Sequence, residues 1–423
     1  MTPAIPILNP TQMSAFNAIE NTHSNLLILG PAGTGKSTFV NYLKSMSKKR
    51  IVCACPTAVS ALNVGGQTIH SLFQIQPRDF IMPEFLKLKA KPRNILTATD
   101  VLIIDEISMV APDLLDAIDI LARYARHNNE PFGGIQVVAI GDLFQLPPVI
   151  TRDATQYYAT EYGHPNAYFF DSNVYKRADF IKFNFDFVYR QSDVPLLDNL
   201  VRLRNNDTTA LEFFNTCRID DTERRTNAVI ITPFRAVAER INATRLAQIN
   251  ETSVVYNGVL SGTFADRDVP APLALELKVG ALVVFVKNSD KWHNGSMGIV
   301  RSLSARDVTV QLLSDSRELV TVKPDKWEKI EYARDENDRL IEREVGSYKQ
   351  FPLNLGYAMT IHKAQGKTLD AVIVDISRGA FAHGQVYVAL SRTRTSGDMH
   401  IASPLHSRDV IFDNRVIDFV ADI

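Results

Sequence analysis

The stretch LGPAGTGKST, from Leu29 to Thr38, constrains the fold more than any other part of the chain. It contains the complete pattern G-x-x-x-x-G-K-[ST], follows the apolar run NLLIL, and opens a stretch of helical periodicity. A glycine-rich loop between a buried strand and a helix offers backbone N–H groups and the positive helix end to phosphate oxygens. The sequence therefore predicts an α/β fold with a parallel sheet that binds a nucleoside triphosphate and Mg²⁺ at this loop.

Two side chains of this loop have expected roles of their own. The amine of Lys36 should reach the β- and γ-phosphates, and the hydroxyl of Ser37 should ligate Mg²⁺. The residues of the loop that we expect to contact the nucleotide are Gly30, Gly33, Thr34, Gly35, Lys36, Ser37 and Thr38.

Two later segments supply the other groups that phosphoryl transfer needs. In LIIDE, Asp105 ends a buried strand and should hold Mg²⁺, while Glu106 is placed to polarise the attacking water. In GDLFQLPPV, which follows a further buried strand, we expect Gln145 to hydrogen-bond to the γ-phosphate. The two prolines stiffen the loop behind it, so that a shift at the phosphate is passed on. A rigid turn that does not contact the nucleotide is the alternative for this last segment.

Buried strands and helices alternate in two separate series. The first contains a helix from Thr11 to Asn21, the strands VLIIDE and IQVVAIGD, and a helix from Pro112 to Arg126; the second contains the strands AVIITPF and DAVIVDI and the helix QVYVALSR. Between the two parts of the second series, strand-like runs dominate from about 250 to 350, namely ALVVFVKN, MGIVRSLS, DVTVQLLS and ELVTVKP. The pattern predicts two α/β lobes with parallel sheets, the second interrupted by a small β-barrel.

Composition limits the environment of the chain and the partners that it can bind. The net charge of the 423 residues is −1, so a polyanion would have to be bound in a local groove and not by a global positive field. The cysteine count is three, which argues against a disulfide framework and for a reducing compartment. The sequence shows no signal peptide and no run of 18 apolar residues, so we expect a soluble cytoplasmic protein with no membrane partner, associated with the nucleoid if it is bacterial or from a phage.

Seven segments in order carry a family resemblance that spans nearly the whole chain, from about Asn9 to Arg394. They are GPAGTGKS, PTAVSALNVGGQTIHS, IIDEISM, GDLFQLPPV, YRQ, TIHKAQGKTLD and VYVALSRTR. In this order they resemble the helicase motifs of superfamily one, in the RecD-like branch and within it the petite-integration-frequency helicases. GGQTIHS and GDLFQLPPV are the most specific segments, and LKVGALVVFVKN with NGSMGIV resembles the family's entry into an SH3-like barrel.

The resemblance implies an ATP-dependent DNA helicase that moves 5′ to 3′ on single-stranded DNA. Two RecA-like domains would hold ATP between them: residues 1–185 with a small wedge insertion at about 74–99, and residues 186–249 with 351–423, interrupted by the barrel at 250–350. Expected partners are single-stranded DNA and forked or 5′-tailed duplexes, with G-quadruplexes and RNA–DNA hybrids as candidate substrates. A monomer is the default expectation, and the family relation points to DNA repair, recombination and telomere maintenance.

Further nucleotide contacts follow from the resemblance alone. Arg190 in YRQ matches the arginine of the fourth motif and Arg392 that of the sixth, so both would enter the ATP cleft from the second lobe. Gln12 in NPTQ matches the glutamine that reads the adenine edge, and Gln365 and Gly366 of the fifth motif should lie near the γ-phosphate. The segment TIHKAQGKT is not a second phosphate loop, because His362 stands where the first glycine would be.

Single strands are held by backbone contacts and stacking, and the chain places suitable residues after its strands. Each lobe has a hydroxyl residue after a strand and then the sequence Thr-Ile-His. This repetition fits one site per lobe that holds a DNA phosphate, here called a phosphate grip. The expected DNA contacts are Pro56, Thr57, Thr68, His70, Ser71, Phe73, Thr232, Phe234, Thr360, His362 and Lys363. Taken singly, the hydroxyls are also explained as helix caps and the histidines as core or capping residues.

The insertion at about 74–99 is expected to provide the strand-separating wedge. Its apolar candidates are Phe80, Met82 and Phe85, and it also carries a basic cluster of Lys87, Lys89, Lys91 and Arg93 that could touch DNA or simply face solvent. Two other functions remain open: a single-strand translocase or RecD-like subunit that does not unwind duplexes alone, and a nucleotide-gated DNA-binding switch without processive movement.

Overall fold

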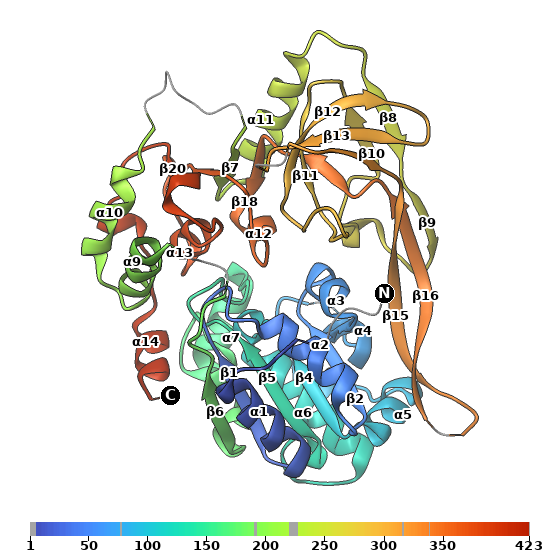
Figure 1. Ribbon diagram of the computed structural model, residues 1–423. Helices are drawn as coiled ribbons and strands as arrows, with labels where there is room; N and C mark the ends of the chain where they lie inside the picture. Colours follow the sequence, from blue (N-terminus) through green and yellow to red (C-terminus); the bar gives the residue numbers. More distant parts are fainter. Residues whose placement is uncertain are drawn as a thin grey trace.

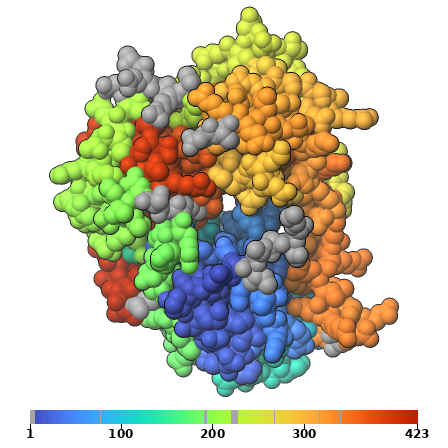
Figure 2. Space-filling model, in the orientation of Figure 1, coloured from blue at the N-terminus to red at the C-terminus, as the bar shows by residue number. Residues whose placement is uncertain are grey.

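A computed structural model describes residues 6–76, 78–189, 193–219, 227–314, 317–337 and 339–422. Two α/β lobes lie one above the other, with a β-rich region beside the upper lobe (Figure 1). Figure 2 shows the same arrangement as a surface, with the blue N-terminal lobe below the red and orange C-terminal half. None of the helices within the described part of the chain is long and apolar enough to cross a membrane.

The first lobe is built on a six-stranded parallel sheet in the order β3-β2-β4-β5-β1-β6. The strands β1, β2, β4 and β5 are buried almost throughout, as expected for continuous apolar runs in a sheet covered on both faces. Their bounds are β1 Asn25–Leu29, β2 Ile51–Cys55, β3 Gln67–Thr68, β4 Val101–Ile104, β5 Gln136–Gly141 and β6 Phe180–Asn184.

Helices pack on both faces of this sheet, and the two long helices predicted from the sequence are present. They are α1 Pro10–Asn21, α2 Lys36–Met46, α3 Ala58–Val64, α4 Ile69–Phe73, α5 Ala90–Ala98, α6 Pro112–Arg126, α7 Arg152–Tyr162 and α8 Asn173–Arg177. A capping box fixes the start of α1, because the side chain of Asn9 accepts a hydrogen bond from the backbone N–H of Gln12 at 2.8 Å and that of Gln12 accepts one from Asn9.

The second lobe repeats the design with a four-stranded parallel sheet in the order β18-β7-β19-β20. Its strands are β7 Val229–Thr232, β18 Ala358–Thr360, β19 Val372–Val374 and β20 Met399–Ile401. Its helices are α9 Val194–Arg204, α10 Leu211–Thr216, α11 Arg235–Ala247, α12 Ile361–Ala364 and α13 Gln385–Leu390.

The final helix, α14 Asn414–Ala421, leaves the second lobe and packs against the first (Figure 1). The rings of Phe419 and Phe170 stack with their centroids 4.4 Å apart, and Arg415 pairs with Asp171 at 3.1 Å. The chain therefore returns to its first lobe at its end, which a domain division by sequence alone does not show.

The β-rich region inserted into the second lobe consists of three antiparallel sheets, in the orders β14-β13-β12-β11-β17, β15-β16-β9 and β10-β8. The four strands predicted from the sequence are β11 Leu282–Phe285, β12 Met297–Leu303, β13 Val308–Leu312 and β14 Leu319–Val322. The others are β8 Val254–Asn257, β9 Val259–Gly262, β10 Ala274–Leu277, β15 Asp325–Arg334, β16 Leu340–Gln350 and β17 Leu353–Leu355. The SH3-like barrel and the domain boundaries stay predictions.

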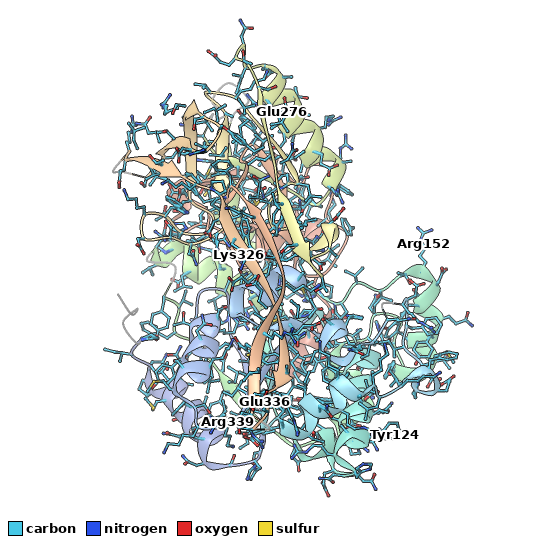
Figure 3. The ribbon with its side chains drawn as sticks, turned by 90° about the vertical axis from the view of Figure 1, so that its right-hand side faces the viewer. Tyr124, Arg152, Glu276, Lys326, Glu336 and Arg339 are labelled. Carbon is cyan, nitrogen blue, oxygen red and sulfur yellow. The ribbon has the colours of Figure 1, made fainter. Side chains whose placement is uncertain are left out.

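A long hairpin, β15–β16, extends from this region down to the first lobe. Figure 3 shows it running from Lys326 to a tip near Glu336 and Arg339, beside the first lobe. Tyr332 is buried there: its hydroxyl accepts a hydrogen bond from the backbone N–H of Cys53 at 3.0 Å, and its own N–H donates to Gln67 Oε1 at 3.1 Å. The hairpin thus joins the β-rich region to the first-lobe sheet.

Candidate nucleotide site and nucleic-acid grooves

The phosphate loop joins β1 to α2 in the first lobe, as the sequence predicted. Gly33 and Gly35 have φ angles of 87° and 80°, which favour glycine, and α2 begins at Lys36. A Cβ on Gly30 would lie 2.3 Å from the carbonyl oxygen of Phe185, so this position has no room for a side chain. Ser37 lies exposed in the first turn of α2, where its hydroxyl can meet a metal ion.

The amine of Lys36 lies inside the loop and close to three carboxylates. Its Nζ donates hydrogen bonds to the carbonyl oxygens of Gly30 and Pro31, both at 2.8 Å. Burial lowers the pKa of Lys36, while the charges of the carboxylates of Asp142, Glu106 and Asp105 act to raise it. The loop, the lysine and these acids therefore form one charged cluster at the carboxyl ends of the strands.

Asp105 and Glu106 follow β4 directly and differ in their expected tasks. Asp105 is 7% exposed, and its Oδ1 accepts a hydrogen bond from the backbone N–H of Glu106 at 3.0 Å. Burial, together with the charge of Asp105, raises the pKa of Glu106 to about 7. A carboxyl group with a pKa close to neutrality is suited to accept a proton from water. Gln365 of the second lobe donates a hydrogen bond to Glu106 Oε2 at 3.2 Å, so the fifth motif reaches this carboxylate.

The loop after β5 lies directly against the second lobe. Gln145 is 5% exposed and its amide donates to Asp142 Oδ2 at 3.0 Å. His383 Nε2 is 2.8 Å from the carbonyl oxygen of Leu143, and a Cβ on Gly384 would lie 2.3 Å from that of Phe144. The loop is therefore in direct contact with the second lobe. The two prolines predicted a stiff loop but did not show which part of the protein it contacts.

Of the two arginines predicted to enter the ATP cleft, the structure describes only Arg392. Arg392 is fully buried in the second lobe, where its guanidinium donates hydrogen bonds to the carbonyl oxygens of Val388 at 2.6 Å and of Ala364 and Lys367 at 3.3 Å. These contacts tie the loop of the fifth motif to α13. Arg190 lies outside the described residues.

The side of the loop predicted to meet the adenine contains a residue that the sequence reasoning missed. Gln12 is 4% exposed and donates to the carbonyl oxygen of Thr34 at 3.3 Å, so it also holds the phosphate loop. Tyr189 donates its backbone N–H to the carbonyl oxygen of Gly33 at 2.8 Å, and its hydroxyl accepts a hydrogen bond from Asn9 at 3.2 Å. Its half-exposed ring is a stacking surface beside the loop. The sequence feature that could have identified Tyr189 is its position immediately before Arg190 in the segment YRQ.

The two Thr-Ile-His phrases have the same local structure in the two lobes. Thr68 caps α4 and Thr360 caps α12, where their hydroxyls accept hydrogen bonds from the backbone N–H of Ser71 at 3.3 Å and of Lys363 at 3.2 Å. Thr57 caps α3 in the same way. A capping hydroxyl accepts one hydrogen bond and keeps its own proton to donate, so capping is compatible with contact to a phosphate.

Two grooves border α12 of the second lobe. One lies between this lobe and the β-rich region and includes Thr360, Lys363 and Lys367; the other lies between the two lobes and includes Pro148 and His362. His362 and Lys363 are exposed. Near the second groove the rings of Phe234 and Phe381 lie 5.5 Å apart. The exposed side chains of α12 thus border two grooves that are candidate binding sites for a strand.

The structure places two of the predicted DNA contacts differently. Phe73 is 1% exposed and packs in the first-lobe core, because the helical turn that leaves His70 and Ser71 at the surface directs Phe73 inwards. Thr232 is 2% exposed and pairs with Thr360 across the sheet. Pro56, His70 and Ser71 are partly exposed. In the segment predicted to form the wedge, Phe80 stacks on Tyr157, and Phe85 is 58% exposed.

Comparison with known proteins agrees with this geometry. The family model of the PIF1-like helicases matches residues 7–192. The ATP-dependent DNA helicase Pif1 of Bdellovibrio bacteriovorus is 31% identical over 97% of this chain and 91% of its own length. The chain belongs to the PIF1-like helicase family. The human ATP-dependent DNA helicase PIF1 is also 31% identical over 99% of the chain, which spans 64% of that longer protein.

Solved structures of a Bacteroides Pif1, which is 34% identical to this chain, show the same fold. Its complex with ADP-AlF4 superposes with a TM-score of 0.90 over 99% of this chain and 97% of that one. The same relative bound to single-stranded DNA superposes with a TM-score of 0.70 at the same coverage. This PIF1-like chain therefore has the two-lobed motor fold, in an arrangement closer to the first of these two complexes.

Proposed function

We propose that this PIF1-like helicase hydrolyses ATP to move 5′ to 3′ along single-stranded DNA and to unwind forked or 5′-tailed duplexes. The observation that carries the proposal is the continuity of one short segment. Residues 360–366 contain Thr360, His362 and Lys363 at the grooves and Gln365 on the carboxylate of Glu106. A change at the nucleotide can therefore act on the strand path through a few covalently linked residues.

The nucleotide would lie over the phosphate loop between the two lobes. Lys36 would leave its carbonyl partners for the β- and γ-phosphates, and Ser37 and Asp105 offer the oxygen ligands that Mg²⁺ prefers. When bound, Mg²⁺ would neutralise charge on the phosphates. Gln12 and the ring of Tyr189 would hold the adenine. The relative solved with ADP-AlF4, in which the aluminium fluoride stands in for the phosphoryl group in transfer, supports the binding of ATP by this fold.

In the hydrolysis step, Glu106 would accept a proton from the attacking water while Gln365 orients its carboxylate. Gln145 would hydrogen-bond to the γ-phosphate, and Gly366 leaves the backbone free to approach. Arg190 and Arg392 would stabilise the charge of the transition state. Because Arg392 is hydrogen-bonded to second-lobe carbonyls, this role requires that it exchange them for phosphate oxygens as the lobes close.

The DNA would follow the grooves at α12 and continue past the helix caps of the first lobe. Thr68 and Thr360 would donate their hydroxyl protons to backbone phosphates, and the half-buried ring of Phe234 or the exposed ring of Phe381 would stack on a base. The relative solved with single-stranded DNA supports this partner class. One grip per lobe lets closure of the ATP site shorten the distance between the grips, which is the physical requirement for stepping.

Strand separation with purified protein tests the proposal. Duplexes with a 5′ tail, a 3′ tail or no tail are incubated with ATP and Mg²⁺, or with ADP as the control. Unwinding of the 5′-tailed duplex alone is the expected result. ATPase activity that single-stranded DNA raises, without unwinding of any substrate, would favour the single-strand translocase. ATPase activity that DNA does not raise would favour the nucleotide-gated switch.

A further inference from the structure

Arg204, the last residue of α9 in the second lobe, reaches across to the first lobe beside the nucleotide site. Its Nη2 lies 3.6 Å from Asp142 Oδ1, and its guanidinium lies over the ring of Phe144, 4.6 Å from the centroid. Both partners belong to the loop that follows β5. No sequence motif singled out this arginine, because a lone basic residue at a helix end is also explained by the helix dipole.

Asp142, the partner of Arg204, is a fully buried carboxylate. It accepts hydrogen bonds from the amide of Gln145 at 3.0 Å, from the N–H of Phe144 at 3.3 Å and from the hydroxyl of Tyr387 of α13 at 3.5 Å. Buried charged groups in proteins are as a rule paired with a group of opposite charge. Arg204, Asp142 and Lys36 are close enough to interact electrostatically. The charge of Asp142 acts to raise the pKa of Lys36, and the charge of Arg204 acts to lower the pKa of Lys36.

The contact between Arg204 and Asp142 is long for an ion pair. At 3.6 Å the pair is outside hydrogen-bonding distance, and in the described part of the chain neither Nε nor Nη2 of Arg204 has a hydrogen-bond partner. Buried N–H groups gain from a shorter contact, because an unsatisfied buried donor destabilises the folded state. A small movement of the second lobe towards the first would convert this loose pair into a hydrogen-bonded one.

We propose that Arg204 is a positioning residue of the nucleotide site, which tightens on Asp142 as the lobes close and so fixes Gln145 for hydrolysis. The proposal rests on the proposed function, because it assigns the closing motion of the motor to a specific contact. Arg204 acts through Asp142 and Gln145 and does not itself touch the phosphates. It therefore contributes to turnover more than to the binding of ATP.

Arg202, on the same helix, provides a matched control. Positions two apart on an α-helix lie about 200° apart, and Arg202 faces solvent, where it pairs with Asp207 at 2.9 Å. The experiment measures kcat and KM for ATP, with and without oligo(dT), in the wild type and in Arg204→Gln, Arg204→Lys, Arg202→Gln, Asp142→Asn and the Arg204→Gln/Asp142→Asn double variant.

We expect Arg204→Gln to lower the DNA-stimulated kcat at least about tenfold, which corresponds to about 1.4 kcal/mol, while KM stays within about threefold. Arg204→Lys keeps the charge and should recover part of the loss, and Arg202→Gln should match the wild type. In the Asp142→Asn background the loss from Arg204→Gln should largely vanish, because contacting residues are not additive.

Three results would overturn the inference: wild-type turnover in Arg204→Gln, a loss that Arg204→Lys does not reduce, or a loss of full size in the Asp142→Asn background. If Arg204→Gln does not fold, Arg204→Lys and Asp142→Asn decide, with reduced kcat at unchanged KM expected for both and wild-type kcat overturning the inference. Failure of the proposed function would be seen separately, because oligo(dT) would then not raise the ATPase activity of the wild type.

Discussion

Two of the regions that join the second lobe and its β-rich insertion to the first lobe are built differently. The nucleotide seam consists of the pairs Asp142–Arg204, Glu106–Gln365 and Leu143–His383. The hairpin seam consists of Tyr332 with Cys53 and Gln67, and of the ion pairs Glu331–Lys91 and Glu342–Lys44. The first seam includes charged side chains of the candidate nucleotide site, whereas the second has a buried aromatic ring with satisfied polar groups at its centre.

This difference indicates which property each seam controls. Contacts that are long or charged, such as Arg204 with Asp142, change strongly with small movements, because Coulomb and hydrogen-bond energies depend steeply on distance and burial. The contacts of Tyr332 are short and buried, so they favour one arrangement of the hairpin on the sheet. We therefore expect substitutions at the nucleotide seam to change turnover and those at the hairpin seam to change stability.

The largest expected effects concern the nucleotide seam, and the first of them comes from Lys36, compared with Lys44 further along α2. Lys36→Ala should lower ATP hydrolysis by about 10²- to 10³-fold, the effect of removing a preorganised donor at a developing charge. Binding of single-stranded DNA should stay within about threefold, since the role proposed for the amine is contact with the nucleotide and not with the strand. ATPase assays and fluorescence anisotropy with oligo(dT) measure the two quantities.

Lys44 is the control because its amine serves the hairpin seam, donating to the carbonyl oxygen of Gly65 at 2.6 Å and pairing with Glu342 at 3.0 Å. Lys44→Ala should lower the melting temperature and leave turnover unchanged. Lost DNA binding with retained hydrolysis in Lys36→Ala would contradict the role given to that lysine.

The next effect is the pH dependence of hydrolysis that Glu106 imposes. Its pKa, raised by burial and by Asp105 to about 7, means that the proton-accepting carboxylate exists mainly above that pH. We expect kcat/KM for ATP to rise from acid towards alkaline pH with a midpoint near 7, because this parameter reports the free enzyme. Glu106→Gln should lower kcat by about 10²- to 10⁴-fold and abolish the midpoint. A midpoint that survives in this variant would show that another group titrates.

The parts of this architecture that the sequence predicted are those with strong local signals. The glycine pattern and the apolar runs identified the phosphate loop, the buried strands and the position of Asp105, because parallel strands buried on both faces have continuous apolar sequences. Gln365 was placed near the γ-phosphate only through the family resemblance. Its contact with Glu106 depends on how the two lobes meet, which no local pattern specifies.

The hairpin seam escaped prediction for a related reason. The strands β15 and β16 are rich in charged residues, and most positions of their ribbon are exposed or half-buried, so no apolar alternation marks its reach to the first lobe. Phe73 was misplaced because a surface motif does not show which face of a short helix turns inwards. Arg204 was missed because its sequence context does not distinguish it from the solvent-facing Arg202.

A moderate effect on stability is expected from Tyr332→Phe at the hairpin seam. The substitution removes the acceptor for the N–H of Cys53 and should lower the free energy of unfolding by about 1–3 kcal/mol, the cost of an unsatisfied buried donor. Turnover should stay within about twofold in the ATPase assay. Tyr124→Phe is the matched control, because Tyr124 is 57% exposed and should show no change in chemical denaturation. A large loss of turnover at unchanged stability would mean that the hairpin also controls the nucleotide site.

The smallest expected effect tests whether ion pairs or the buried tyrosine hold the hairpin. The side chains of Lys91 and Glu331 are 40% and 24% exposed, so water screens their attraction. Glu331→Gln should lower the free energy of unfolding by no more than about 1 kcal/mol, and the difference should shrink in about 1 M salt, where the screening length is about 3 Å. Glu318→Gln removes a comparable pair with Lys291 away from the seam and is the control. The contrary result would be a loss as large as that of Tyr332→Phe that does not shrink in salt. It would mean that an ion pair shielded from water holds the hairpin, so that both seams depend on charge.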